Sequence, residues 1–234
     1  MATINDKLRY AFSPNLGGKA GTLYSWYPNE ATSDFTVVRP NEADRINSEG
    51  ETETMGVNVP LLDYSNGGCA RLKTTATDVI SGAGDSSTFE QTNGVMYFEI
   101  LASSDANARY VWKFKDDADN RIDLGFNTSN ELFIEVFSGG TSDGSIVFDE
   151  NIKVSNKVGF EYANNDIVMW VNGIEIASLS QLIPNAFNEI GMDSFVGFTS
   201  SILNYEALTT DELITLFGYK SYAEMTNHFG FNTL

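Results

Sequence analysis

Between about residue 89 and residue 205, apolar and polar residues alternate with the two-residue period of β-strands. The segment 109–115 places three aromatic residues on one face and three basic residues on the other: Tyr110, Trp112 and Phe114, against Arg109, Lys113 and Lys115. Further strand candidates are 94–102, 121–126, 132–137, 145–148, 157–162, 195–199 and 202–205. Turn-forming residues separate them, and no helical pattern intervenes. This spacing predicts an antiparallel β-sandwich.

The clearest local prediction is a β-hairpin at residues 166–178. Two runs rich in β-branched and aromatic residues flank Asn172 and Gly173. Asn-Gly is the preferred pair for a type I′ turn because both central positions need a positive φ. We expect Trp112 and Trp170, which lie on strands, to belong to the core.

The first 88 residues have a different pattern. Short apolar bursts alternate with Gly, Asn, Ser, Thr and Asp, and four of the five prolines lie here: Pro14, Pro28, Pro40 and Pro60. This composition predicts an extended arm with a few short strands. The arm either contacts neighbouring subunits or completes the edge of the sandwich, and the sequence leaves both readings open.

The last zone, 208–234, predicts short helices packed on the sandwich. In the first helix, Thr209 is the N-cap, Glu212 completes a capping box and Gly218 ends the helix. A second helix is expected at residues 221–228. The domain organisation is therefore 1–88 arm, 89–207 sandwich and 208–234 helices.

The net charge of the chain limits the classes of partner that we expect. The 234 residues include 14 basic and 32 acidic side chains, a net charge of −18. Such a chain repels phosphate backbones and anionic lipid, so we expect neither nucleic acid nor a membrane as partner. The N-terminus shows no secretory leader, and no stretch approaches the ~20 apolar residues of a membrane span. The single cysteine, Cys69, fits folding in a reducing cytoplasm.

Two resemblances extend this picture. From residue 89 to residue 218 the chain resembles a concanavalin A-like domain of the LamG or legume-lectin type. The residues that carry the resemblance are KVGFEYANNDIVMWVNGIEIAS (157–178) and LNYEALTTDELITLFGY (203–219). The resemblance implies an all-β jelly roll: an antiparallel β-sandwich with an extended N-terminal arm and short C-terminal helices.

The segment 21–73, with the Lys19-Ala20 pair before it, resembles a segment found near the start of structural proteins of tailed phages, especially those that infect Bacteroidota. It reads KAGTLYSWYP, SDFTVVRP, ADRINSEGETE and GVNVPLLDYSNGGCARL in this order. Leu61 and Ala70 depart from the family pattern, which has arginine and proline there, and the usual LLEPQrTN continuation is missing. The resemblance implies a virion tail, fibre or other appendage protein, assembled in the host bacterial cytoplasm. Its partners would be other virion proteins, copies of itself (trimers are common in fibres) and host-surface glycan.

A jelly roll can also carry a glycosidase site, which needs two carboxyl groups. Glu131 and Glu135 share one face of a strand candidate. Four residues of extended chain separate them by ~13 Å, beyond the ~5–9.5 Å of glycosidase pairs. We therefore expect no enzyme and no catalytic residues.

Two other kinds of site are candidates. Asp116, Asp117, Asp119 and Asn120 gather oxygen-bearing side chains in one turn, where LamG-type domains often hold calcium. A strand-connecting turn of this composition needs no metal, so the favoured reading is a plain turn and no cofactor.

Trp26, Tyr27 and Tyr64 lie in the loop-rich arm. They are candidates either for stacking on a sugar or for anchoring a neighbouring subunit.

These observations together predict a non-enzymatic structural component of a tailed-phage virion that displays a lectin-like domain. The alternatives are a dedicated receptor-binding lectin, a glycan depolymerase and a capsid decoration protein.

Overall fold

The computed structural model describes residues 4–12, 18–19, 22–26, 33–38, 45–46, 52–53, 61–63, 71–74, 79–83, 89–102, 109–151, 156–163, 165–181, 183–184, 186–193 and 197–218. The expected second helix at 221–228, as well as Cys69, lies outside them.

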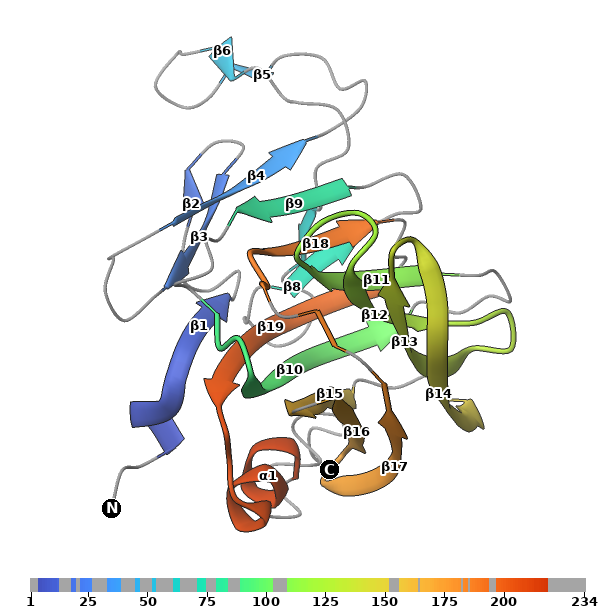
Figure 1. Ribbon diagram of the computed structural model, residues 1–234. Helices are drawn as coiled ribbons and strands as arrows, with labels where there is room; N and C mark the ends of the chain where they lie inside the picture. Colours follow the sequence, from blue (N-terminus) through green and yellow to red (C-terminus); the bar gives the residue numbers. More distant parts are fainter. Residues whose placement is uncertain are drawn as a thin grey trace, which may run out of the picture.

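The elements follow one another along the chain as a long series of strands with a helix at the end (Figure 1). Before residue 89 they are the 3-10 helix η1 (Ile4–Lys7) and the strands β1 (Leu8–Phe12), β2 (Gly18–Lys19), β3 (Thr22–Trp26), β4 (Ser33–Val38), β5 (Arg45–Ile46), β6 (Thr52–Glu53), β7 (Leu61–Asp63), β8 (Arg71–Thr74) and β9 (Val79–Ala83). After it they are β10 (Asn93–Ala102), β11 (Arg109–Lys115), β12 (Arg121–Phe126), β13 (Glu131–Ser138), β14 (Thr141–Asn151), β15 (Asn156–Ala163), β16 (Asp166–Val171), β17 (Ile174–Ser180), β18 (Glu189–Asp193), β19 (Gly197–Glu206) and α1 (Thr210–Phe217).

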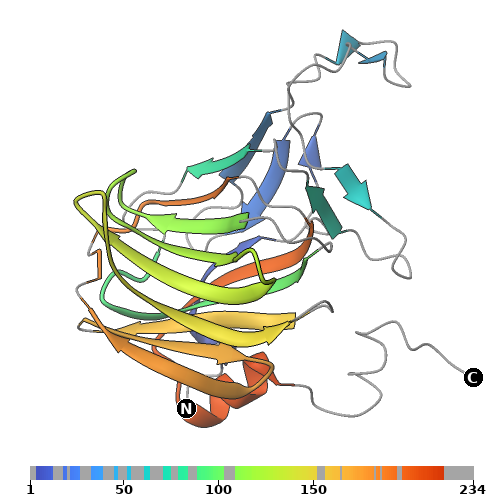
Figure 2. The same ribbon diagram turned by 90° about the vertical axis from the view of Figure 1, so that its right-hand side faces the viewer.

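Most of the strands form two packed layers, β5 and β6 pair only with each other in a separate two-stranded sheet, and every pairing among the described strands is antiparallel. One layer, the helix layer, has the order β17-β16-β15-β10-β19, with β1 and β8 both on the far side of β19. The other, the charged layer, has the order β14-β13-β12-β11-β18-β9-β4. Strand β3 pairs with both β1 and β4 and so joins the two layers along one side. Figure 2 shows the layers from the side. The predicted antiparallel sandwich is confirmed.

The main core fills the space between the layers. Its buried side chains alternate along β10, β11, β12, β13, β15 and β16. Phe114 on β11 lies at its centre and stacks on Phe187 with 3.8 Å between the ring centroids. Trp112 is 1% exposed, as expected for a core residue. Because the core takes every second residue of each strand, the residues between them point away from it.

Helix α1 covers the outer face of the helix layer. A second apolar cluster lies beneath it, in which Phe217 stacks on Trp170 at 6.1 Å and contacts Tyr97 at 5.5 Å. Gly159 makes room for this contact, since a Cβ there would lie 1.9 Å from the Met96 carbonyl oxygen and 2.9 Å from Phe217. Trp170 is thus buried as expected, but under the helix and not between the layers.

Both ends of α1 follow the sequence signals. The Thr209 hydroxyl accepts from the Glu212 backbone N–H, and the Glu212 side chain accepts from the Thr209 N–H, which is the predicted capping box. Lys7 adds an ion pair to Glu212 at 2.6 Å. The helix ends at Phe217. Gly218 has φ −84° and does not form a left-handed cap; a Cβ there would lie 2.3 Å from the Ile214 carbonyl oxygen.

The predicted hairpin is confirmed between β16 and β17. Asn172 has φ +51° and Gly173 φ +85°, as a type I′ turn requires. The Asn172 side chain also accepts from the Lys157 N–H at 3.0 Å and donates to Asn156 at 2.7 Å. The turn is therefore tied to the start of β15.

The strands before residue 89 add to both layers. Strands β1 and β8 pair with β19, and β9 pairs with β18 (Figure 1). Tyr10 on β1 is 2% exposed and contacts Phe89 in the main core at 5.2 Å. This segment therefore supplies edge strands of the sandwich, while contacts with neighbouring subunits stay a prediction.

Candidate functional site

The outer side of the charged layer carries a row of charged residues that crosses three strands. Lys113 on β11 lies directly opposite Asp123 on β12, and Asp123 lies opposite Glu135 on β13. Residues opposite each other in neighbouring antiparallel strands have Cβ atoms ~5 Å apart. The row therefore places an ammonium group and two carboxyl groups side by side on the sheet.

A second row lies beside the first, offset from it by two residues on each strand. It consists of Glu189 on β18, Lys115 on β11, Arg121 on β12 and Phe137 on β13. Lys115 Nζ and Glu189 Oε1 form an ion pair of 3.0 Å. We call the two rows together the charged face: Lys113, Lys115, Arg121, Asp123, Glu135, Phe137 and Glu189.

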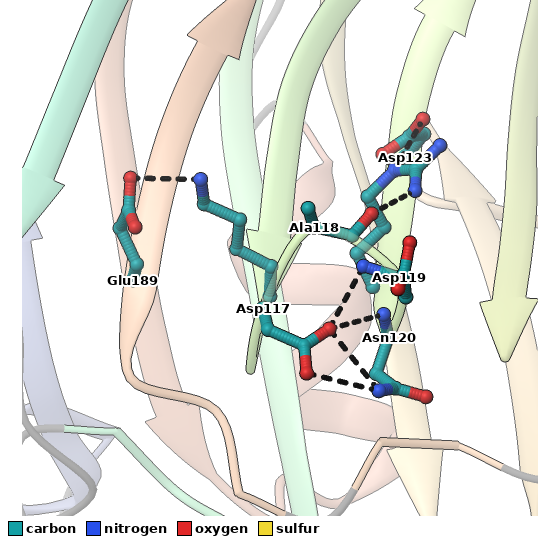
Figure 3. Close-up of polar contacts among 8 residues, drawn as sticks. Asp117, Ala118, Asp119, Asn120, Asp123 and Glu189 are labelled. Atoms are coloured by element: carbon teal, nitrogen blue, oxygen red, sulfur yellow. Dashed lines mark hydrogen bonds and ion pairs between the residues drawn. The ribbon is translucent and has the colours of Figure 1, made fainter. Parts of the chain in front are cut away.

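Arg121 is fixed by three neighbours, of which Figure 3 draws Ala118 and Asp123. Its Nε donates to Asp123 Oδ1 at 3.0 Å and to Oδ2 at 3.2 Å, and its Nη1 donates to the Ala118 carbonyl oxygen. The guanidinium carbon lies 3.7 Å from the centre of the Phe137 ring. A planar guanidinium stacked on a ring and bonded at its edges has little rotational freedom left.

Asp123 lies at the bottom of this arrangement and is 1% exposed. Burial raises the pKa of Asp123 to about 6, although Arg121 and Lys113 favour the ionised form; Glu135 raises it further. Both carboxylate oxygens accept from Arg121, so this group has no free access to a substrate.

Chemically, the charged face offers hydrogen-bond donors from its lysines and its arginine, and acceptors from its carboxylates. An apolar row borders it, with Phe133 on β13 opposite Val147 on β14, of which Val147 is 45% exposed. Such a surface can bind a ligand that has both hydroxyl groups and apolar C–H faces.

The calcium candidates lie in the turn between β11 and β12, at the end of this face. The Asp117 carboxylate accepts from the backbone N–H groups of Asp119 and Asn120, both at 2.8 Å, and from the Asn120 side chain (Figure 3). These bonds lower the pKa of Asp117. Asp116 accepts from Asn188 at 3.3 Å.

The remaining carboxylate of the turn points elsewhere. A Cβ added to Gly140 would lie 3.1 Å from Asp119 Oδ1, which places this oxygen beside the turn between β13 and β14. Two hydrogen bonds also join the two turns. The Gly139 N–H donates to the Asn120 side-chain oxygen, and the Gly140 N–H donates to the Asp119 carbonyl oxygen. In the part of the chain that the structure describes, no group of three His, Cys, Asp or Glu side chains could hold a metal ion. The geometry is that of a self-bonded turn, and calcium binding stays an untested alternative.

The other sequence candidates are spread over the chain. Trp26 lies at the end of β3, where only its backbone is described, and Tyr27 and Tyr64 lie outside the described residues. Glu131 and Glu135 lie on the same strand, and Glu131 accepts from Asn127 at 2.6 Å.

The sequence pattern alone does not single out Asp123, Arg121 or Phe137 as site residues. A signal for Asp123 was present, since it is a charged residue in the middle of the apolar strand 121–126. Phe137 comes from a different strand, so its contact with Arg121 follows only from strand register. Arg121 lies on the same strand as Asp123, but its orientation is fixed by the bond to the Ala118 carbonyl oxygen in the preceding turn.

No protein-family model matches this sequence, and no curated protein matches it. Solved structures do match. A botulinum neurotoxin type C structure, from a study of cell entry dependent on two ganglioside molecules, has a TM-score of 0.66 at 11% identity over 93% of this chain and 52% of that one. The binding domain of botulinum neurotoxin DC in complex with rat synaptotagmin II gives 0.63 at 12% identity, over 92% and 52%.

A third solved structure is a domain of nearly the same length as this chain. Domain 4 of AbnA, a GH43 extracellular arabinanase from Geobacillus stearothermophilus, in complex with arabinotriose, has a TM-score of 0.62 at 13% identity over 90% of this chain and 98% of that one. This chain thus spans about half of the neurotoxin chains and nearly all of the arabinanase domain. At these identities the likeness establishes the fold, a jelly-roll sandwich of the kind the sequence predicts. Within the described ranges, no helix has both the length and the apolarity of a membrane span.

Proposed function

We propose that this chain is a non-enzymatic structural component of a tailed-phage virion whose sandwich binds glycan on the host surface. The observation that carries the glycan-binding part is the charged face. It is a sheet face with fixed donors and acceptors and a bordering apolar row, whereas the outer face of the helix layer is covered by α1.

The fold supports the same proposal. The arabinanase domain was solved with arabinotriose, and the neurotoxin type C study concerns gangliosides. The neurotoxin DC domain was solved with a protein, synaptotagmin II, so the fold also accommodates protein partners. For this chain, the polar sheet face favours a sugar over a protein as the ligand.

The virion part of the proposal rests on the sequence segment 21–73 and its resemblance to tailed-phage structural proteins. Partners would be other virion proteins and further copies of this chain. The short strands before residue 89 add to the sandwich, and contacts of the N-terminal segment with those partners are part of this proposal.

Two experiments test the proposal separately. The full chain is applied to a panel of bacterial-surface and plant oligosaccharides, with heat-unfolded chain as control; we expect saturable binding to a subset. Antibodies against the chain should label assembled phage particles in electron micrographs. Absence of binding to every saccharide would refute the first part, and unlabelled particles the second. Release of reducing sugar from a bound glycan would show a depolymerase instead.

A further inference from the structure

The charged face is electrically balanced. It has three cationic groups, from Lys113, Lys115 and Arg121, and three carboxyl groups, from Asp123, Glu135 and Glu189. Lys115 and Arg121 are each paired with a carboxylate at 3.0 Å. The chain as a whole has a charge of −18. An anionic ligand would find no excess of positive charge here and would be repelled by the rest of the molecule.

A neutral, hydroxyl-bearing ligand matches the face better. Each hydroxyl group both donates and accepts a hydrogen bond. The first row offers the donor Lys113 and the acceptor Glu135. The second row offers the donors Lys115 and Arg121 and the acceptor Glu189. Hydrogen bonds to charged groups are stronger than those between neutral groups, so paired ions can bind hydroxyls without a ligand charge. From β18 to β13 the second row spans about 14 Å at the usual strand spacing, which is longer than a single sugar ring.

Within the charged face, Arg121 and Asp123 have different roles in ligand binding. The Arg121 side chain is 16% exposed and that of Asp123 is 1% exposed. A ligand on the sheet can therefore reach the guanidinium but not the carboxylate beneath it. Asp123 acts on a ligand only through Arg121, whose orientation it fixes together with the Ala118 carbonyl oxygen and the Phe137 ring.

We propose that the charged face binds an uncharged oligosaccharide laid across the strands, with Arg121 as its central contact and Asp123 as the positioning residue that holds Arg121. This inference rests on the glycan-binding function proposed above and adds the ligand class and the residues.

The test compares neutral and acidic oligosaccharides (uronate- or sulfate-bearing) for binding to the folded full chain and its variants. We expect binding of neutral saccharides only, with an affinity that changes less than about twofold when NaCl is raised, because no net charge is neutralised. Arg121→Gln should weaken binding at least about tenfold, since it removes a contact made with a charged donor. Arg9→Gln is the matched control: Arg9 also pairs with a carboxylate, that of Glu206 at 3.5 Å, but on the helix layer.

The role of Asp123 has a separate readout, the pH dependence of binding. The charged groups that face its carboxyl are Arg121 on its own strand, Lys113 on β11 and Glu135 on β13. As Asp123 takes up a proton near pH 6, Arg121 loses its charged partner, and we expect affinity to fall about fivefold between pH 7 and pH 5. Asp123→Asn should bind at pH 7 as weakly as the unmodified chain does at pH 5, with no further pH dependence. Glu135→Gln should keep the pH dependence, with its midpoint moved to lower pH.

The possible results separate the two proposals. Binding by the unmodified chain that is unchanged in folded Arg121→Gln protein would overturn this inference and leave glycan binding intact. Binding of acidic saccharides that weakens strongly with salt would overturn the ligand class. No saccharide binding at all would overturn both. If Arg121→Gln does not fold, Arg121→Lys, which keeps the charge and loses the planar donors, replaces it and should also weaken binding.

Discussion

Replacing Asp123 with asparagine should change how the stability of the protein depends on pH. The side chain is buried on a sheet face and its carboxylate is bonded to Arg121. Burial nevertheless dominates and raises the pKa of Asp123 from an ordinary value of 3.8 to about 6. Asparagine has nearly the same shape and no proton to gain or lose in this range.

The sign follows from proton linkage. Because the pKa of Asp123 is higher in the folded chain than in the unfolded one, the folded state holds a proton between about pH 4 and pH 6 that the unfolded state has lost. Stability from this group is therefore present at low pH and decreases as the pH rises to about 6. Each pKa unit corresponds to about 1.4 kcal/mol, so the change from 3.8 to about 6 amounts to about 3 kcal/mol of unfolding free energy.

The measurement is urea unfolding of the unmodified chain and of Asp123→Asn at several pH values from 4 to 7.5. We expect the difference in unfolding free energy between the two proteins to shift by about 3 kcal/mol over this range, with the unmodified chain losing stability towards neutral pH. Groups that titrate equally in both proteins cancel in the difference. Asp143→Asn is measured beside it as the control for removing an acidic side chain, because Asp143 is exposed on β14.

Two results would refute the reasoning. A difference that stays flat between pH 4 and pH 7.5 would mean that burial does not determine the protonation of Asp123. A difference of opposite sign, with Asp123→Asn losing less stability at low pH, would mean that the ion pair with Arg121 outweighs burial and lowers the pKa.

Three further substitutions test the packing of the helix layer and of helix α1. Gly159→Ala should cost about 3 kcal/mol or prevent folding, since its Cβ would lie 1.9 Å from the Met96 carbonyl oxygen; a melting temperature near that of the unmodified chain would contradict this. Asn204 on β19 is buried; its side chain accepts from the Glu90 backbone N–H and donates to the Tyr162 hydroxyl, both at 2.9 Å. Asn204→Ala should therefore cost about 1–3 kcal/mol in urea unfolding, because both hydrogen bonds are lost. A loss below about 0.5 kcal/mol would mean that water replaces the amide. Thr209→Ala should cost about 1 kcal/mol through loss of the helix cap; loss of helical circular dichroism without this cost would point to local fraying only.

The parts of the fold that the sequence predicts well are those specified by local chemistry. Asn172 and Gly173 adopt the positive φ angles that their turn requires, and Thr209 and Glu212 form the capping box at the start of α1. Strand β12 begins and ends where alternation predicts, at residues 121–126. Each of these depends on residues close together in the chain.

The sequence predicts less well those elements that are specified by pairing with strands far away in the chain. Strand β18 (Glu189–Asp193) was not predicted, because its five residues include a glycine and two acids and it is specified by pairing with β11 and β9. Residues 197–199 of the candidate 195–199 and the whole candidate 202–205 belong to one strand, β19 (Gly197–Glu206). The charged face was missed for the same reason: its rows exist only once strand register is known.

The pairing of β1 with β19 has a consequence for how the chain folds as it is synthesised. Leu8 lies opposite Tyr205, and Phe12 lies opposite Ile202, so about 200 residues separate β1 from this partner, whereas its other partner, β3, follows closely in the chain. Ribosomes add residues one after another, so β1 can pair with β3 early in translation but has no β19 until β19 has been made. Contacts of such large sequence separation also slow folding. If β1 pairs in this interval with β19 of another copy, we expect the fraction of strand-exchanged oligomer to rise with the concentration of chains during refolding.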